Sequence, residues 1–377
     1  MVHLPARVRI LATALAFIFA LNTSGLAAPK KSSSKSSSRS KSYSRTRHSS
    51  RSRYPAVDPT IGDNAQFDDP VVRQVAISAL GKFNGSVLAM DPKTGRILTI
   101  VNQKMAFSSG FEPCSTIKPT IAIAGLEQGI ITRDTMLQVG RRRYMDLTEA
   151  LAHSNNQFFE EVGRKLGFDS VHHYAELMGL GQRAGYNIDE EQPGLLPSAP
   201  PRDGVGRMSS FGQGIKITPL QLASVVSTVA NGGTMYYLQY PRSEEEIQTF
   251  SPRIRRQLDL APLMPELREG MMAAVMYGTA KRSYDPEGEQ ALGKTGTCND
   301  ETVGGRLGWF ASYVDPSHPR MVVVVLLHGG GHRTSGPGAA EVAGRLYRGL
   351  RERNYFADLS REQQQQQAVA SAGDGTR

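Results

Sequence analysis

The residues with the clearest chemical potential are a serine and a lysine three positions apart, Ser115 and Lys118. A serine hydroxyl is too weakly acidic to attack an amide unaided, so a nucleophilic serine needs a base beside it. Lys118 can act as that base if burial and a nearby positive charge keep its amine neutral. Residues three apart on a helix share a face. The pair predicts nucleophilic acyl transfer, although an ordinary surface helix could carry the same spacing.

Two further segments supply groups of the same kind. Ser154-Asn155-Asn156 offers a second hydroxyl with an amide, and Lys294-Thr295-Gly296-Thr297 offers a second amine with two hydroxyls. Lys294 is the natural source of the charge that would lower the pKa of Lys118. Each segment alone also fits a structural role, as a helix start or a solvent-facing strand. All three, in this order, favour a serine acyl-transferase.

The helices that must position these residues can be predicted from chain breaks and periodicity. Pro113 interrupts the chain before Ser115, and apolar residues then recur at helical spacing, so Ser115 is expected at a helix N-terminus. Ser154 to Asn156 should form the turn between two helices. Residues 181–204 contain four prolines and should form a long loop. The other predicted helices cover 147–153, 157–166, 218–230 and 339–353.

The strands are predicted from short apolar runs between turn residues. Two such runs, 85–90 and 96–101, are separated by Asp91-Pro92-Lys93-Thr94-Gly95 and predict a hairpin. Two stronger runs follow at 307–314 and 321–327. We expect the central strands of the resulting sheet to carry Lys294-Thr295-Gly296.

The first residues have the pattern of an export signal over 1–27. Arg7 and Arg9 precede an apolar run over 10–21, and Gly25-Leu26-Ala27 offers small residues for cleavage after Ala27. An uncleaved anchor in the inner membrane is the alternative, although the run is shorter than the ~20 residues that a span needs. In both cases we expect an exported, periplasmic or otherwise extracytoplasmic domain, where a disulfide can persist.

Residues 28–60 are expected to form a disordered basic tether. Nine lysines and arginines and no acid lie within 30–53, so this stretch carries as much charge as the whole chain, +9, and the remainder is close to neutral. A Ser/Lys/Arg composition cannot offset the entropy of ordering. The tether could contact anionic membrane or cell-wall polymer, or serve only as a spacer; nucleic acid is not an expected partner. The Gln-rich end, 357–377, is expected to be a disordered tail.

Most of residues 80–330 resemble penicillin-binding transpeptidases of the serine β-lactamase superfamily. The resemblance implies an α/β fold of the α+β type over 61–356, with an antiparallel sheet flanked by helices, an all-helical lobe and the active site between them. We expect no glycosyltransferase or pedestal domain ahead of it. Beyond the three motifs, it rests on Asp91 to Gly95, Phe111-Glu112-Pro113, Ser210-Phe211-Gly212-Gln213-Gly214, Thr218-Pro219-Leu220-Gln221, Asn231-Gly232-Gly233 and Gly308-Trp309-Phe310.

The same resemblance implies what each motif does. Its substrates would be the D-Ala-D-Ala stem peptides of peptidoglycan, with β-lactams as mimics, and no metal or cofactor would be needed. The oxyanion would be held by the backbone N–H groups of Ser115 and Thr297. The implied catalytic residues are Ser115 as nucleophile, Lys118 as base, Ser154 as proton relay and Lys294 as the positive charge. The implied substrate-binding residues are Asn156 for the amide side chain, Thr295 and Thr297 for the terminal carboxylate, and Gly296 for close backbone approach.

The two cysteines flank the first and third motifs, as Cys114 and Cys298. In the implied fold the strand that carries Lys294 runs along the N-terminus of the Ser115 helix, so the two sulfurs should be close enough to form a disulfide. Two buried free thiols are the alternative.

Other functions of the superfamily stay open. Class A β-lactamases carry a Glu-x-x-x-Asn element for the deacylating water, whereas Glu190 and Glu191 are followed four residues later by Gly194 and Leu195. The cysteine positions nevertheless resemble certain class A carbapenemases. A D,D-carboxypeptidase would differ only in using water as the acceptor. A non-catalytic β-lactam sensor or cell-wall scaffold is a further alternative, and the two intact lysines argue against it.

Overall fold

A computed structural model describes residues 58–357 of the chain. The expected export signal, nearly all of the expected tether and the Gln-rich tail lie outside these residues. Within 58–357, no helix combines the length and the apolar character needed to cross a membrane.

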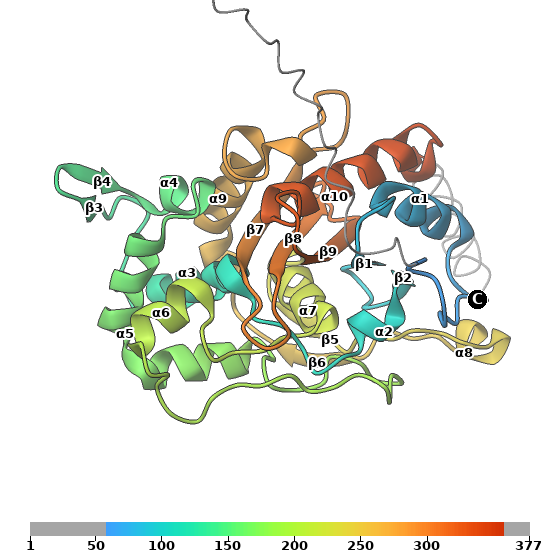
Figure 1. Ribbon diagram of the computed structural model, residues 1–377, viewed down its shortest axis with the longest axis horizontal. Coiled ribbons are helices and arrows are strands. Elements are labelled where there is room, and N and C mark those ends of the chain that lie inside the picture. Colours follow the sequence, from blue (N-terminus) through green and yellow to red (C-terminus); the bar gives the residue numbers. More distant parts are fainter. Residues whose placement is uncertain (1–57, 358–377) are drawn as a thin grey trace, which may run out of the picture. The chain divides into compact units, whose positions relative to one another are not determined.

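The fold is built on a five-stranded antiparallel sheet with strand order β2-β1-β9-β8-β7 (Figure 1). The predicted hairpin and the two apolar runs near the C-terminus all form strands of this sheet, and β8 pairs with β9 from Arg306↔Gly329 to Val314↔Met321. The strands are β1 (Gly85–Met90), β2 (Ile97–Val101), β7 (Ala291–Asn299), β8 (Arg306–Val314) and β9 (Met321–Gly329).

The prediction that central strands carry Lys294-Thr295-Gly296 is wrong. These residues lie on β7, which pairs with β8 alone and forms one edge of the sheet. The interior positions go to β1, β8 and β9, and the long apolar runs of β8 and β9 are buried. β7 carries two glycines, two threonines and a lysine in its middle, and such a strand gains little from apolar neighbours on both sides. One side of its backbone therefore stays open.

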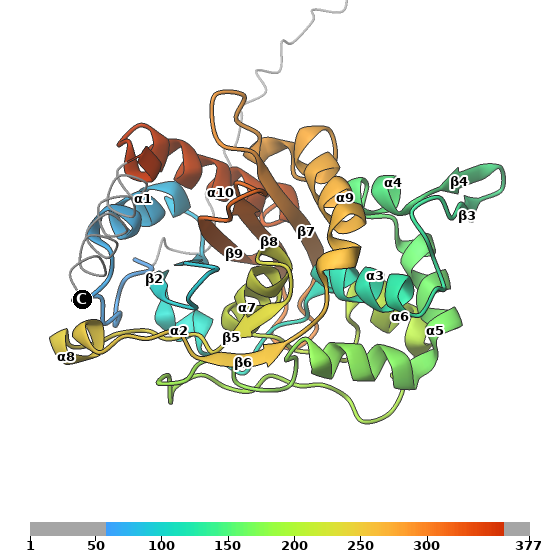
Figure 2. The same cartoon turned by 180° about the vertical axis from the view of Figure 1, so that it is seen from behind.

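Helices cover both faces of the sheet, as the two opposite views show (Figures 1 and 2). On one face α1 (Pro70–Leu80) packs with α10 (Gly336–Arg351), and on the other lies α7 (Pro219–Ala230). The predicted helix at 218–230 begins with a reciprocal cap: Gln221 N donates to Thr218 Oγ1 at 3.1 Å, and Thr218 N donates to Gln221 Oε1 at 2.9 Å.

An all-helical lobe lies beside the β7 edge (Figure 1). It contains the predicted helices on either side of Ser154, and the second of them is longer than expected and is interrupted at Gly167. The predicted long loop over 181–204 precedes α6. The lobe consists of α3 (Lys118–Glu127), α4 (Leu147–Ala152), α5 (Asn156–Leu177), α6 (Gly204–Phe211) and α9 (Met264–Met276).

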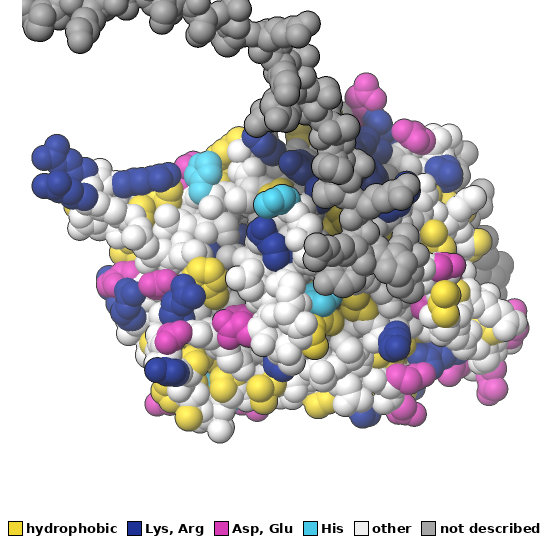
Figure 3. All heavy atoms as spheres, viewed as in Figure 1, with side chains coloured by type: hydrophobic (Ala, Val, Ile, Leu, Met, Phe, Trp, Pro, Cys, Tyr) yellow, Lys and Arg dark blue, Asp and Glu magenta, His cyan; other side chains and the backbone are white. Residues whose placement is uncertain are grey.

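The remaining elements are short. A hairpin of β3 (Leu137–Gly140) and β4 (Arg143–Met145) projects from the helical lobe, and basic side chains gather at its tip (Figure 3). The others are α2 (Gln103–Ala106), η1 (Cys114–Ile117), β5 (Thr234–Tyr236), α8 (Glu244–Gln248), β6 (Ile254–Gln257), η2 (Ala261–Leu263) and η3 (Lys281–Ser283).

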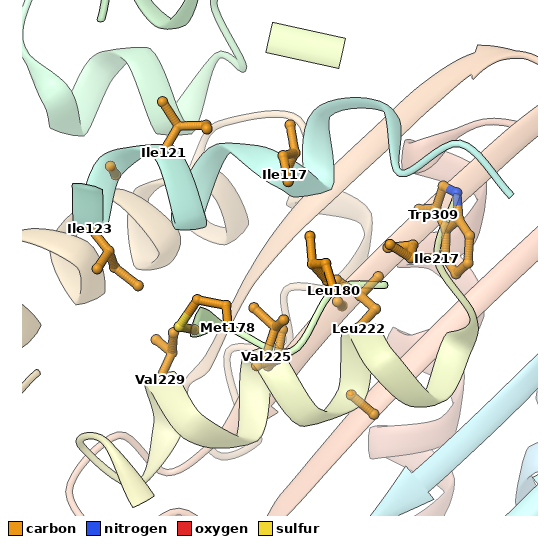
Figure 4. Close-up of a cluster of buried hydrophobic side chains, with 14 of the residues drawn as sticks. Ile117, Ile121, Ile123, Met178, Leu180, Ile217, Leu222, Val225, Val229 and Trp309 are labelled. Carbon is orange, nitrogen blue, oxygen red and sulfur yellow. The ribbon is translucent and has the colours of Figure 1, made fainter. Parts of the chain in front are cut away.

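The two faces of the sheet contribute to two separate hydrophobic clusters. Along β1, Leu88 and Met90 join the cluster shared with α7 and the helical lobe, while Val87 and Ala89 join the cluster under α1 and α10. This is the period-two alternation of a strand buried on both sides. In the first cluster Ile117 and Ile121, from the segment that carries Ser115, lie above Val225 and Val229 of α7 (Figure 4). The core thereby fixes the motif-bearing segment against the sheet.

Candidate active site

Ser115 and Lys118 lie in one continuous turn of helix. Ser115 belongs to the 3₁₀ turn η1, and Lys118 begins α3 directly after it. The side chain of Lys118 is fully buried, and Ser115 retains 7% exposure. Cys114, immediately before the serine, has a left-handed backbone with φ of 51°. Such a conformation costs energy in a non-glycine residue and persists where the surroundings enforce it.

Ser154 lies at the junction between α4 and α5 and is the second strained residue of the site. Its φ is 55°. Asn155 caps α5 through Oδ1, which accepts from Phe158 N at 2.9 Å, and Asn156 is the first residue of that helix. The capped helix and the left-handed residue before it together hold the Ser154 hydroxyl towards Lys118.

Two lysine amines converge on the Ser154 hydroxyl. Lys294 Nζ lies 2.7 Å from Ser154 Oγ, and Lys118 Nζ lies 3.2 Å from the same oxygen. Lys118 Nζ also donates to the Ser154 carbonyl at 2.6 Å and to Asn156 Oδ1 at 2.8 Å. The Ser115 hydroxyl makes no hydrogen bond to any residue within 58–357. The structure thus brings Lys118, Ser154, Asn156 and Lys294 together, and within the described part of the chain the hydroxyl of Ser115 has no hydrogen-bond partner.

The pKa values of both lysines are depressed. Burial lowers the pKa of Lys118 well below its usual range, and the charge of Lys294 lowers it further, against a smaller opposing effect of Glu160. Burial lowers the pKa of Lys294 to about 7. No carboxylate within 58–357 forms an ion pair with either amine. Near neutral pH the pair therefore holds less charge than two lysines would in water, and a neutral amine becomes available as a base.

The two threonines of the third motif are hydrogen-bonded to residues from other parts of the chain. Thr297 Oγ1 accepts from Gly336 N, at the start of α10, at 2.7 Å, and the hydroxyls of Thr295 and Thr279 lie 2.6 Å apart. Thr279 and Gly336 have no motif to mark them, and sequence reasoning missed them. They fix the rotamers of these two threonine side chains on β7.

Gly296 is required by the close approach of η1. A Cβ at this position would lie 2.9 Å from the Pro113 carbonyl oxygen and 3.1 Å from Thr116 Cγ2. The serine-bearing turn thus packs closely on Gly296, which is a reason for glycine at this position in addition to the expected approach of substrate backbone. Any larger residue would push β7 away from Ser115.

The disulfide between Cys114 and Cys298 is present, with Cα atoms 5.6 Å apart. It ties the start of η1 to β7 at a position two residues beyond Gly296. Trp309 adds a second fixed contact, since its Nε1 donates to the Glu112 carbonyl at 2.9 Å. The resemblance had pointed to Trp309 and Glu112 without giving either a role. Together these contacts hold the serine turn against the edge strand.

Comparison with known proteins agrees with this geometry. The family model described as penicillin binding protein transpeptidase domain matches residues 85–348. The chain is 26% identical to stage V sporulation protein D of Bacillus subtilis over 313 residues, covering 69% of this chain and 48% of that protein. It is 29% identical to penicillin-binding protein PbpB of Mycolicibacterium smegmatis over 305 residues, covering 66% and 46%. The chain therefore spans about half the length of these relatives.

The fold also matches solved structures. The transpeptidase domain of Burkholderia pseudomallei penicillin-binding protein 3 superposes with a TM-score of 0.65 at 21% identity, covering 76% of this chain and 94% of that one. Penicillin-binding protein 2 of Pseudomonas aeruginosa gives a TM-score of 0.64 at 22% identity, covering 75% of this chain and 74% of that one. At such identities the likeness establishes the α+β fold expected from the sequence.

Proposed function

The chain belongs to the penicillin binding protein transpeptidase domain family, and from this premise we propose that it is a peptidoglycan D,D-transpeptidase. Its donor substrates are stem peptides that end in D-Ala-D-Ala, and β-lactams inhibit it by acylating the same serine. The observation that carries the proposal is the Ser154 hydroxyl shared by two buried amines next to Ser115.

In the proposed reaction, neutral Lys118 takes the proton of Ser115 as the serine oxygen attacks the carbonyl carbon of the penultimate D-alanine. The backbone N–H groups of Ser115 and Thr297 stabilise the resulting oxyanion. Ser154 then passes a proton to the leaving D-alanine nitrogen, and the contacts of its hydroxyl with both amines support this role. The acyl-enzyme that remains is released when the amine of a neighbouring stem attacks it.

The substrate is proposed to lie along the open edge of β7. The hydroxyls of Thr295 and Thr297, with the charge of Lys294, receive its terminal carboxylate. Asn156 binds the amide of the peptide, and its Oδ1 contact with Lys118 supports a position in the cleft. An extended peptide on an edge strand gains affinity through backbone hydrogen bonds, so little side-chain area is needed.

Two carboxylates that could have supported a β-lactamase are engaged elsewhere. Glu191 is fully buried and accepts from Gly185 N at 2.7 Å and Thr218 Oγ1 at 3.1 Å. Glu190 pairs with Arg242 at 2.7 Å. Both residues therefore hold the long loop 181–204 in place, and neither is free to activate a deacylating water. This favours a long-lived acyl-enzyme.

We also propose the organisation of the whole chain: an export signal or inner-membrane anchor at 1–27, a basic tether at 28–60, the transpeptidase domain at 61–356 and a tail at 357–377. The disulfide supports an extracytoplasmic location, because such bonds persist in oxidising compartments. The tether is proposed to contact anionic membrane or cell wall. Salt-sensitive loss of binding to anionic vesicles or sacculi on deleting 30–53 would support that contact, and equal retention at low salt would exclude it.

The function is tested by following a fluorescent penicillin adduct over hours and by mass analysis of muropeptides after incubation with peptidoglycan. The proposal predicts a persistent adduct and new cross-linked dimers. Rapid loss of the adduct would indicate a β-lactamase, trimming without dimers a carboxypeptidase, and no adduct a scaffold. Ser115→Ala should abolish labelling, and Ser78→Ala, on the exposed side of α1, is the matched control.

A further inference from the structure

The hairpin of β3 and β4 carries three consecutive arginines at its tip, Arg141 to Arg143, and all three are exposed. Gly140 pairs with Arg143, so the turn contains only Arg141 and Arg142 and holds the three side chains close together. The hairpin projects from the helical lobe in both ribbon views, and basic side chains cover its end (Figures 1, 2 and 3). The tip therefore concentrates positive charge where another molecule can reach it.

No counter-charge in the described part of the chain compensates this cluster. The three arginine side chains form no ion pair or hydrogen bond with any residue in 58–357, and no acidic residue lies within 135–145. By contrast, Arg133, which precedes the hairpin, pairs with Glu269 at 2.7 Å. Adjacent like charges repel, so the cluster does not stabilise the fold by itself and is complementary to an anionic partner.

The hairpin has one buried face and one exposed face. Leu137 and Met145 pair across the two strands, and both are buried in the hydrophobic cluster of the helical lobe. The next pair, Gln138 and Tyr144, is on the opposite face and is exposed, and Met136 directly precedes β3. Tyr144 and Met136 each keep 55% of their surface accessible to solvent. An aromatic ring and a thioether chain are thus exposed on the same hairpin as the arginines.

This combination of clustered arginines with exposed apolar side chains is typical of segments that bind the surface of a bilayer. Arginines are attracted to anionic headgroups, and tyrosine is enriched at the headgroup level, where its ring is apolar and its hydroxyl meets water. An anionic polymer would be held by charge alone, which leaves Tyr144 and Met136 without a role. A stable protein partner needs a far larger buried area than two side chains provide. The hairpin therefore fits a lipid surface best.

We propose that the tip of this hairpin docks the domain on a membrane that contains anionic phospholipids. The three arginines lie among the lipid phosphates, and Tyr144 and Met136 enter the boundary between headgroups and acyl chains. This contact is distinct from the one proposed for the basic tether, because the hairpin is part of the folded domain and fixes the orientation of that domain on the membrane. The inference does not depend on the proposed transpeptidase activity.

Tyr144→Trp in the full-length chain places a fluorescent reporter on the hairpin. Trp309 is the only tryptophan of the chain and is fully buried, so the wild-type protein supplies the baseline emission. Vesicles of phosphatidylglycerol and phosphatidylcholine at low salt should shift the reporter emission to shorter wavelength, and brominated acyl chains in these vesicles should quench it. Phosphatidylcholine alone should have neither effect, and salt at about 0.5 M should weaken both effects.

Two triple variants of equal net charge, both made in the reporter protein, assign the effect to the hairpin. The tip variant combines Arg141→Gln, Arg142→Gln and Arg143→Gln, and the control combines Lys82→Gln, Lys104→Gln and Arg202→Gln at other exposed positions. The tip variant should lower the ratio of inserted to free hairpin, measured from the shifted emission, by about 100-fold. The control should stay within about twofold of the reporter protein.

Three outcomes would overturn the proposal. Equal losses in the two triple variants would show that net charge alone matters. Unchanged reporter emission, in protein that nevertheless sediments with anionic vesicles, would assign the contact to another part of the chain. An emission shift with purified sacculi and none with vesicles would identify an anionic wall polymer as the partner in place of lipid.

Discussion

Two buried polar clusters in this molecule differ in whether their positive charges are paired with carboxylates. In the Arg73 cluster the guanidinium lies 3.0 Å from Asp63 and 3.0 Å from Asp68, and Asp68 also accepts from Thr99 and Tyr240. In the lysine cluster two amines share one serine hydroxyl, and no carboxylate within residues 58–357 pairs with them. In the Arg73 cluster the cation is paired with carboxylates, and the cluster joins the segment before α1 to β2. In the lysine cluster two groups of the same charge lie side by side.

The difference separates the cluster that holds the fold from the cluster that is proposed to perform chemistry. Although burial opposes it, the bonds from Asp63 and Asp68 raise the pKa of Arg73, so the ion is kept charged. Burial lowers the pKa values of Lys118 and Lys294, so the charged form is disfavoured. Perturbed groups of the second kind are typical of functional sites. Mutations in the two clusters should therefore affect different measurements.

The largest effect is expected for Lys118→Met. It removes the proposed base and keeps the volume, so the acylation rate by benzylpenicillin should fall by about 10³-fold or more. The free energy of unfolding should not fall, because a buried amine that lacks a counter-charge is lost. Stopped-flow acylation and urea unfolding measure the two quantities, with exposed Lys82→Met as the control. Acylation within a few-fold of wild type would show that another group activates Ser115.

Arg73→Met should show the reverse pattern. It leaves Asp63 and Asp68 buried without their cation, and breaking such a group costs about 3–5 kcal/mol of unfolding free energy. The acylation rate per folded molecule should stay within about twofold of wild type, because the cluster is remote from Ser115. Asp68→Asn combined with Arg73→Met should recover part of the loss. A large drop in acylation for this variant would break the separation between the two clusters.

Removing the disulfide should affect both measurements. Cys114→Ser with Cys298→Ser opens a link between positions 184 residues apart, which should lower the unfolding free energy by about 2–4 kcal/mol. Acylation should also fall, by about tenfold, because β7 and the serine turn are no longer tied together. A reducing agent should reproduce both effects in wild type and leave the double variant unchanged. Full acylation after reduction would limit the bridge to stability.

The smallest effect is expected in the pH dependence of stability. Lys294 has a folded pKa of about 7, below that of an unfolded lysine, so between pH 7 and pH 9.5 the unfolded chain binds more protons at this position. Unfolding free energy should therefore rise with pH in this window, by at most about 1.4 kcal/mol per pH unit for one proton. Lys294→Met should reduce the rise, and the part that remains is due to Lys118, whose pKa is also lowered by burial. Acylation by wild type should fall over the same range, because Lys294 loses the charge that is proposed to receive the substrate carboxylate.

The sequence predicted which polar residues would lie together better than it predicted their surroundings. Ser115 and Lys118 are three residues apart, so helical geometry alone places them together, and a capped turn at Ser154 could be foreseen from its asparagines. The edge position of β7 could not be predicted, because strand order depends on how β1 pairs with β9 and not on any local pattern. For the same reason no local pattern indicated that Arg73 would contact Asp63 and Asp68, or that Glu112 and Arg306 would line one pocket.

The strained backbone at Ser154 is a second feature that could not be predicted from the sequence. Its left-handed φ is enforced by the helices on either side and not by its own residue type. Serine has no preference for this conformation, so the residues alone predict a turn and not its geometry. The orientation of the hydroxyl between two lysines is therefore a property of the packed lobe.

The open edge of β7 has a consequence for the behaviour of the protein in concentrated solution. A strand with one unpaired side is a template for another extended chain, and such edges promote aggregation unless something interrupts them. Lys294 lies in the middle of this edge strand and its side chain is buried. An inward-pointing charged residue on an edge strand discourages pairing with another strand. We therefore expect Lys294→Met to be less soluble than wild type even where its unfolding free energy is higher. Lys294, whose charge lowers the pKa of Lys118, would therefore also keep the protein from associating through this edge.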